Sequence, residues 1–212
     1  MPSLPMTLTL SRIAAIPVLV AMFYVPGDPA RYFAWAVYAA AAITDYFDGY
    51  FARAWSQQTL LGRIFDPIAD KLLVAATILL LVATGRIQGL TVLPALVILC
   101  REILVSGLRE FLTEIRARLP VSRLAKFKTG VQMFSLGFLI IGDALPTAWM
   151  MPSLIGEVLL WTAALLTLVT GYDYLAEGLR HIDHSQQEPA PPTRPAGGPA
   201  RGAAAGSARP AA

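Results

Sequence analysis

Apolar segments long enough to cross a bilayer recur along this chain from residue 8 to residue 177. Each is close to the ~20 residues that a transmembrane helix requires. The chain of 212 residues is 56% hydrophobic and 15% charged, whereas about 25% of the residues in a soluble domain carry a charge. These features predict an all-α, polytopic membrane protein with six transmembrane helices. The expected spans are 8–26, 32–54, 64–85, 88–113, 123–145 and 154–177.

The first of these segments has some features of a secretory signal. Arg12 precedes an apolar run from Ile13 to Val25. A signal peptide would carry its positive charge nearer the start and a small-x-small cleavage site after the run. We therefore expect this segment to remain as the first transmembrane helix.

Basic residues favour one side of the expected helix arrangement. With six spans, both termini and the second-to-third and fourth-to-fifth connections share a side. That side holds most of the Lys and Arg residues, whereas the opposite side keeps only Arg31 and Arg86. The positive-inside rule places the basic side in the cytoplasm. The prediction is a multi-pass protein of the cell (inner) membrane, with both termini and a polar site facing the cytoplasm.

The composition changes near residue 183. No large apolar residue follows Ile182, and Gln, Pro, Ala, Gly and scattered Arg dominate the remaining sequence. Such a segment cannot bury enough apolar surface to fold. The expected organisation is a membrane domain over residues 1–182 and a disordered Pro/Ala/Gly-rich tail over residues 183–212.

Four aspartates between residues 45 and 70 interrupt the apolar pattern. Asp45 and Asp48 lie three residues apart, and Asp66 and Asp70 lie four apart, so each pair occupies one face of a helix. Acids in a bilayer-spanning segment are costly and mark functional sites. A short connection makes the two helices antiparallel neighbours, so the four carboxylates can converge. Oxygen ligands without Cys or His suit two Mg²⁺ or Mn²⁺ ions rather than zinc.

Two simpler interpretations compete with a metal site. Asp66 and Pro67 have the form of a helix N-cap followed by proline at the first helical position. Gly49, Ala52 and Gly62 could serve close helix packing rather than an open groove for a phosphate group. Asp45 fits neither interpretation, because apolar residues flank it on both sides.

The run D-x2-D-G-x2-A-R-x8-G-x3-D-x3-D over residues 45–70 resembles the signature of the CDP-alcohol phosphatidyltransferase family. The resemblance implies a homodimeric membrane enzyme that transfers a phosphatidyl group from CDP-diacylglycerol to an alcohol and releases CMP. It also implies that Asp45, Asp48, Asp66 and Asp70 bind two divalent cations, with Asp70 as the general base. The residues that it assigns to CDP-diacylglycerol are Gly49, Arg53, Thr59 and Thr9.

The acceptor alcohol has to be inferred from the later spans. Arg101 and Glu102 fall inside the fourth span, where a charge must be paired to be tolerated. Further cations follow near the cytoplasmic ends of the fourth and fifth spans, and they predict a pocket for an acceptor that itself carries a phosphate. These segments resemble the family members that use glycerol-3-phosphate, which implies phosphatidylglycerophosphate as the product. The predicted acceptor-phosphate residues are Arg109, Arg123, Lys126 and Lys128.

The sequence leaves other functions open. The basic residues could reflect positive-inside topology and attraction to anionic lipid alone. Within the family, the alternatives are a cardiolipin synthase that uses phosphatidylglycerol and an enzyme that uses inositol phosphate. Membrane prenyltransferases also use aspartate-bound Mg²⁺, but their acidic motifs usually lie far apart in sequence. A divalent-cation transporter would need polar residues on several helices, and the first, fifth and sixth spans offer few. No nucleic-acid partner is expected.

Overall fold

The structure is a computed structural model that describes residues 4–55, 60–114, 123–144 and 151–187. In these residues it is helical and contains no strand, which confirms the all-α prediction. Each described α-helix corresponds to one of the expected apolar segments. The elements are α1 (Leu4–Tyr24), α2 (Asp28–Trp55), α3 (Leu60–Ala83), η1 (Gly89–Thr91), α4 (Val92–Glu114), α5 (Arg123–Ile141), η2 (Gly142–Ala144) and α6 (Pro152–Gln187).

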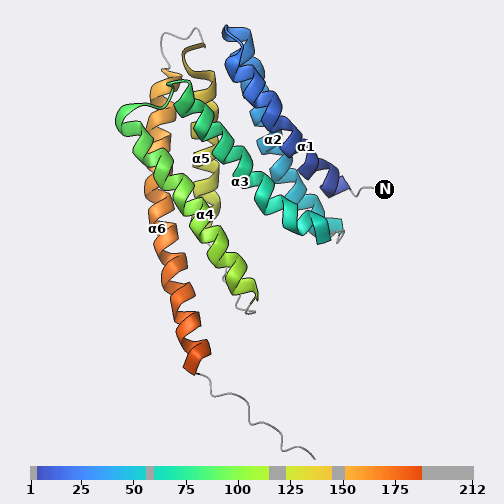
Figure 1. The fold of residues 1–212 in the computed structure, drawn as a ribbon, viewed down its shortest axis with the longest axis vertical. Helices are drawn as coiled ribbons and strands as arrows, with labels where there is room; N and C mark the ends of the chain where they lie inside the picture. The colour runs from blue at the N-terminus through green and yellow to red at the C-terminus, as the bar shows by residue number, and fades with distance from the viewer. Residues whose placement is uncertain (1–3, 56–59, 115–122, 145–150, 188–212) are drawn as a thin grey trace, which may run out of the picture.

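Consecutive helices run in opposite directions through the bundle (Figure 1). The first turns of α1, α3 and α5 and the last turns of α2, α4 and α6 therefore lie toward the same end, the lower one in the view. Helix α1 packs against both α2 and α3, whereas α6 packs against both α4 and α5. This alternation brings the carboxyl end of α4 and the amino end of α5, with their charged residues, to one end of the molecule.

Three segments of the described chain are long and apolar enough to cross a membrane: 89–113, 124–141 and 152–176. A shorter apolar helix covers Thr9–Tyr24. Large apolar side chains project outward from the three longer segments, including Phe127, Phe134 and Leu165, each more than 60% exposed. A soluble domain would keep such residues away from water, so these outer faces suit a lipid environment.

The core between the helices is closely packed. Leu19, Leu81, Ile98, Leu136 and Leu160 come from five different helices and are at most 1% exposed. Helices α5 and α6 approach closely because position 156 is a glycine, where a Cβ would lie 2.7 Å from Leu139 Cγ. The Ser135 hydroxyl also donates a hydrogen bond to the Gly156 carbonyl at 2.8 Å. The α5–α6 pair is thereby fixed in register.

Helix α3 ends in a Schellman motif at the opposite end of the bundle. The Arg86 amide donates to the Leu81 carbonyl at 2.8 Å, and the Gly85 amide donates to the Val82 carbonyl at 3.0 Å. This motif requires a left-handed residue, and Gly85 has φ +68°. The motif directs the chain into the turn that carries Arg86.

Two helix boundaries differ from the sequence-based expectation. Helix α3 begins at Leu60, so Asp66 and Pro67 lie inside it and the interpretation of Asp66 as an N-cap is wrong. Helix α6 continues to Gln187, beyond residue 182, where the expected membrane domain ends. Local sequence signals therefore do not mark the start of α3 or the end of α6.

Candidate active site

The acidic run lies on the last turns of α2 and the first turns of α3. Asp45, Asp48, Gly49 and Arg53 are α2 residues and Asp66 is an α3 residue, but their side chains lie outside the part of the chain that the structure describes. Thr59 also lies outside the described residues. Asp70 is the one member of the predicted metal set whose side chain is described, and it is half-buried on α3.

A group of charged side chains joins α4, α5 and α6 near this end of the bundle. The Lys128 ammonium of α5 forms an ion pair with the Glu102 carboxylate of α4. Arg101 Nη1 lies 3.2 Å from Glu102 Oε1, and Arg101 Nη2 donates to Thr170 Oγ1 of α6 at 3.0 Å. Arg101 and Glu102, each of which needs a partner inside an apolar span, therefore have one. We call Arg101, Glu102, Arg109, Lys128, Thr170 and Tyr174 the polar cluster.

Tyr174 of α6 completes the polar cluster by contacting two guanidinium groups. Its ring centroid lies 5.8 Å from Cζ of Arg101 and 5.3 Å from Cζ of Arg109. Cations at such distances are attracted to the negative face of an aromatic ring. Room for the Arg101 side chain comes from Gly171, where a Cβ would lie 3.2 Å from Arg101 Cγ. Helix α6 therefore contributes the Tyr174 ring, which contacts both α4 arginines, and Gly171, which leaves room for Arg101.

The polar cluster lies within electrostatic reach of α3. Lys128 interacts with Asp70 as well as with Glu102 and Arg101. Glu102 interacts in turn with Lys71, the residue next to Asp70. The predicted general base and the predicted acceptor pocket therefore occupy one continuous charged region between α3, α4 and α5.

The structure separates the predicted acceptor residues into two groups. Lys128 is buried and Arg109 contacts Tyr174, so both belong to the polar cluster. Lys126 is exposed, because two residues along a helix turn its side chain to a different face. The side chain of Arg123 lies outside the described residues.

Several residues of this region were not assigned a site role from the sequence. For Arg101 and Glu102 the available signal is their position inside an apolar segment, where a charge needs a partner. Thr170 and Tyr174 gave no signal, because a threonine and a tyrosine are ordinary near the end of a transmembrane helix. Only the packing of α6 against α4 shows their proximity to the charges.

Helix α1 contributes two buried polar residues. Thr9, predicted to contact CDP-diacylglycerol, is 1% exposed, and Arg12, one turn later, is also 1% exposed. Both make interactions within the structure. A buried guanidinium in an apolar helix agrees with a polar interior at this end of α1.

The donor set suits hard divalent cations. Asp70 presents its carboxylate from a half-buried position on α3, and the other three predicted ligands are also aspartates on α2 and α3. Among the described side chains no group of three His, Cys, Asp or Glu residues gathers. This statement does not include Asp45, Asp48 and Asp66, because their side chains lie outside the described part of the chain.

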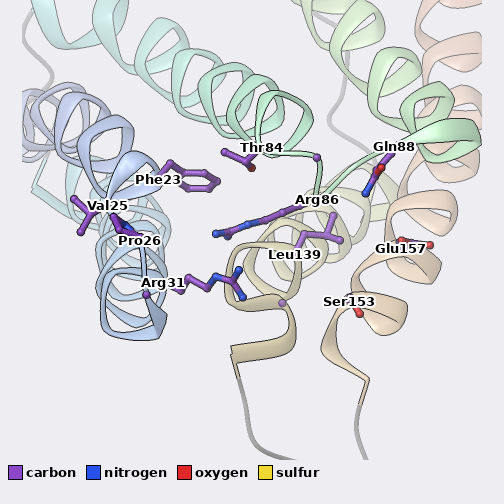
Figure 2. A pocket seen from close by; sticks show the side chains of 13 residues that line it. Phe23, Val25, Pro26, Arg31, Thr84, Arg86, Gln88, Leu139, Ser153 and Glu157 are labelled. Atoms are coloured by element: carbon purple, nitrogen blue, oxygen red, sulfur yellow. The ribbon is translucent and has the colours of Figure 1, made fainter.

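A cavity of about 580 Å³ lies at the opposite end of the bundle, between the α1–α2 turn, the α3–α4 turn and the α5–α6 end (Figure 2). The Arg86 side chain crosses this cavity and donates a hydrogen bond to the Ile140 carbonyl. Its Cζ atom lies 4.8 Å from the centroid of the Phe23 ring. Burial lowers the pKa of the Arg86 guanidinium, and the positive charge of Arg31 lowers it further. No predicted site residue lines this cavity.

These features together define a class: a helical membrane protein with a buried, cation-rich site beside an aspartate-bearing helix. The family model for CDP-alcohol phosphatidyltransferase matches residues 2–169 of the chain. The chain belongs to the CDP-alcohol phosphatidyltransferase family, as the signature at residues 45–70 predicted.

Curated relatives resemble the chain over most of its length. A protein of Rickettsia typhi is 46% identical over 174 residues, which cover 82% of this chain and 96% of the relative. A protein of Shigella flexneri is 38% identical over 176 residues, covering 82% and 93%. A protein of Cereibacter sphaeroides is 34% identical over 214 residues, covering 85% and 97%. Each is named CDP-diacylglycerol–glycerol-3-phosphate 3-phosphatidyltransferase.

Proposed function

We propose that this protein transfers the phosphatidyl group of CDP-diacylglycerol to glycerol-3-phosphate, yielding phosphatidylglycerophosphate and CMP in phospholipid biosynthesis. The observation that carries this proposal is the 46% identity, over nearly the whole length of the relative, to a protein that bears the name of this enzyme. The polar cluster supports the same acceptor, because it places Lys128 and Arg109 in the region of Asp70. An acceptor with its own phosphate requires such cations.

The reaction is a displacement at phosphorus. A hydroxyl oxygen of glycerol-3-phosphate bonds to the phosphorus that carries diacylglycerol, while the bond from that phosphorus to the CMP oxygen breaks. The Asp70 carboxylate takes the hydroxyl proton as the general base. Gly49, Arg53, Thr59 and Thr9 contact CDP-diacylglycerol, and the acceptor phosphate is bound by Lys128, Arg109, Arg123 and Lys126.

Asp45, Asp48, Asp66 and Asp70 would hold two Mg²⁺ or Mn²⁺ ions. When bound, divalent cations neutralise the diphosphate and stabilise charge on the attacking and leaving oxygens. The role of the protein is to bring four carboxylates together at the junction of α2 and α3, where their mutual repulsion favours cation binding.

The membrane arrangement that we propose has six spanning helices, with both termini and the active site on the cytoplasmic side of the inner membrane. The alternating helix directions support this topology, as does the concentration of basic residues at the shared end (Figure 1). We further propose a homodimer, a membrane domain over residues 1–182 and a disordered Pro/Ala/Gly-rich tail that follows the end of α6 at Gln187.

The acceptor is tested with purified protein, CDP-diacylglycerol, Mg²⁺ or Mn²⁺, and one alcohol at a time. CMP release with glycerol-3-phosphate, and not with phosphatidylglycerol or inositol phosphate, is the expected result. Release with phosphatidylglycerol alone would instead identify a cardiolipin synthase. No CMP release with any acceptor, together with cation flux into liposomes, would identify a transporter.

A further inference from the structure

Two polar atoms of the polar cluster have no hydrogen-bond partner among the described residues: the Tyr174 hydroxyl and Arg101 Nε. Tyr174 is 7% exposed, and the Arg101 side chain is 11% exposed. Buried polar groups in folded proteins are almost always paired, because an unpaired one loses its hydration without compensation. One of these atoms belongs to α6 and the other to α4, and Cζ of Arg101 lies 5.8 Å from the centroid of the Tyr174 ring. Two unpaired donors on packed neighbouring helices point to a ligand that supplies the missing acceptors.

The charges around these atoms define what that ligand is. Arg101, Arg109 and Lys128 contribute three positive charges, and Glu102 contributes one carboxylate. Lys71 adds a further cation within electrostatic reach, and Asp70 a further carboxylate. The balance is positive, and both unpaired groups can donate a hydrogen bond: a phenol O–H and a guanidinium N–H. An oxyanion with several acceptor oxygens, such as a phosphate monoester, satisfies both donors at once.

We propose that the Tyr174 hydroxyl and Arg101 Nε bind the phosphate of the acceptor alcohol. This inference rests on the proposed function and deepens it, since it assigns two further residues to recognition of glycerol-3-phosphate. Arg101 is held for this task by Glu102 and Thr170, which use its two terminal nitrogens and leave Nε available. Tyr174 is held by the two guanidinium groups against its ring.

A purely structural role for Tyr174 would not need the hydroxyl. The ring alone makes both cation–ring contacts, so phenylalanine would pack in the same way. In the absence of ligand, a buried unpaired hydroxyl is a cost rather than a gain in stability. The hydroxyl therefore has opposite effects on the empty protein and on the complex, and this difference can be measured.

The test compares Tyr174→Phe with Tyr172→Phe in the full-length protein in detergent. Tyr172 is the matched control, because it lies on the same helix and is 74% exposed. For Tyr174→Phe we expect the KM for glycerol-3-phosphate to rise about tenfold, which corresponds to about 1.4 kcal/mol. The KM for CDP-diacylglycerol should change less than about twofold, and Tm without substrate should stay the same or rise. Tyr172→Phe should match the wild type in all three quantities.

Three results would overturn the inference: an unchanged KM for glycerol-3-phosphate, equal increases in both KM values, or a lower Tm without substrate. The last would mean that the hydroxyl bonds within the protein. If the wild type releases no CMP with glycerol-3-phosphate, the proposed function fails by itself. The inference is then decided by Tm with added glycerol-3-phosphate: stabilisation of the wild type but not of Tyr174→Phe supports it, and no stabilisation of either overturns it.

Discussion

The two ends of the bundle both hold buried or half-buried arginines, but they satisfy them differently. At the far end, Arg86 donates to the carbonyl of Ile140 in the last turn of α5, where carbonyls lack partners within the helix, and covers the Phe23 ring. In the polar cluster, Arg101 keeps an unpaired Nε beside an unpaired tyrosine hydroxyl. The first arrangement is complete without a ligand, whereas the second is not.

The comparison shows that charge alone does not identify a site in this protein. The far-end cavity contains Arg31, Arg86 and Glu157, yet Arg86 there bonds to the fold itself. The polar cluster differs because its cations lie within reach of Asp70 and because donors remain unsatisfied. Substitutions in the polar cluster should therefore change substrate use or catalysis, in some cases together with stability, whereas substitutions at the far end should leave the kinetics unchanged.

The largest effect is expected from Asp70→Asn. The amide keeps the size of the side chain but cannot accept the proton of the acceptor hydroxyl, so kcat should fall at least about a hundredfold. Binding of CDP-diacylglycerol should persist in part, which equilibrium binding of the labelled lipid nucleotide would measure. Asp28→Asn at the far end is the control, because the Asp28 side chain is 62% exposed and only weakly paired with Arg31. Full activity of Asp70→Asn would remove Asp70 from the base role.

The next effect is expected from Glu102→Gln. Glu102 is the shared counter-charge of Lys128 and Arg101, and its side chain is 18% exposed. Removing one partner from a buried ion pair costs ~3–5 kcal/mol. Here we expect about 2–3 kcal/mol, since glutamine retains a hydrogen-bond acceptor and the site is partly open. Thermal unfolding in detergent measures this loss, and Glu157→Gln at the far-end cavity is the matched control. Equal losses in the two variants would mean that the two ends do not differ as described.

A smaller effect, confined to one substrate, is expected from Lys128→Ala. The KM for glycerol-3-phosphate should rise about tenfold, as for the loss of one charge-assisted hydrogen bond, and more than the KM for CDP-diacylglycerol. Lys126→Ala should have a much smaller effect, because Lys126 is exposed and Lys128 is buried. Steady-state kinetics with each substrate varied in turn measures both KM values for the two variants. Similar changes in both variants would favour a general electrostatic attraction over a defined pocket.

Much of the fold follows from the sequence because the bilayer imposes simple rules. Apolar length predicted a helix in each of the six segments, and the structure has one in each. The start of α3 was not predictable from the Asp66–Pro67 motif, because the helix begins at Leu60 and local motifs locate helix ends less well than they indicate the helix itself.

Site residues could be predicted from the sequence where a charged side chain falls inside an apolar helix. Arg101 and Glu102 stand out because charged residues in an apolar helix need partners, and the structure pairs them. Tyr174 was not predictable, because its role depends on α6 passing beside α4, a contact between residues far apart in sequence. The same distance explains why Lys126 and Lys128 looked equivalent in the sequence and differ in burial.

The smallest effect, and the one that tests the far end directly, is expected from Arg86→Ala. The substitution leaves the Ile140 carbonyl without its donor and uncovers the Phe23 ring, so the protein should lose about 1 kcal/mol of stability. Both KM values should stay within about twofold of wild type, because no predicted site residue lies at this cavity. Arg31→Ala is the matched control: its removal relieves the repulsion on Arg86, so it should not destabilise the protein comparably. A selective rise in the KM for glycerol-3-phosphate in Arg86→Ala would show that the two ends are coupled, and the division between a structural arginine and a substrate-binding one would then be wrong.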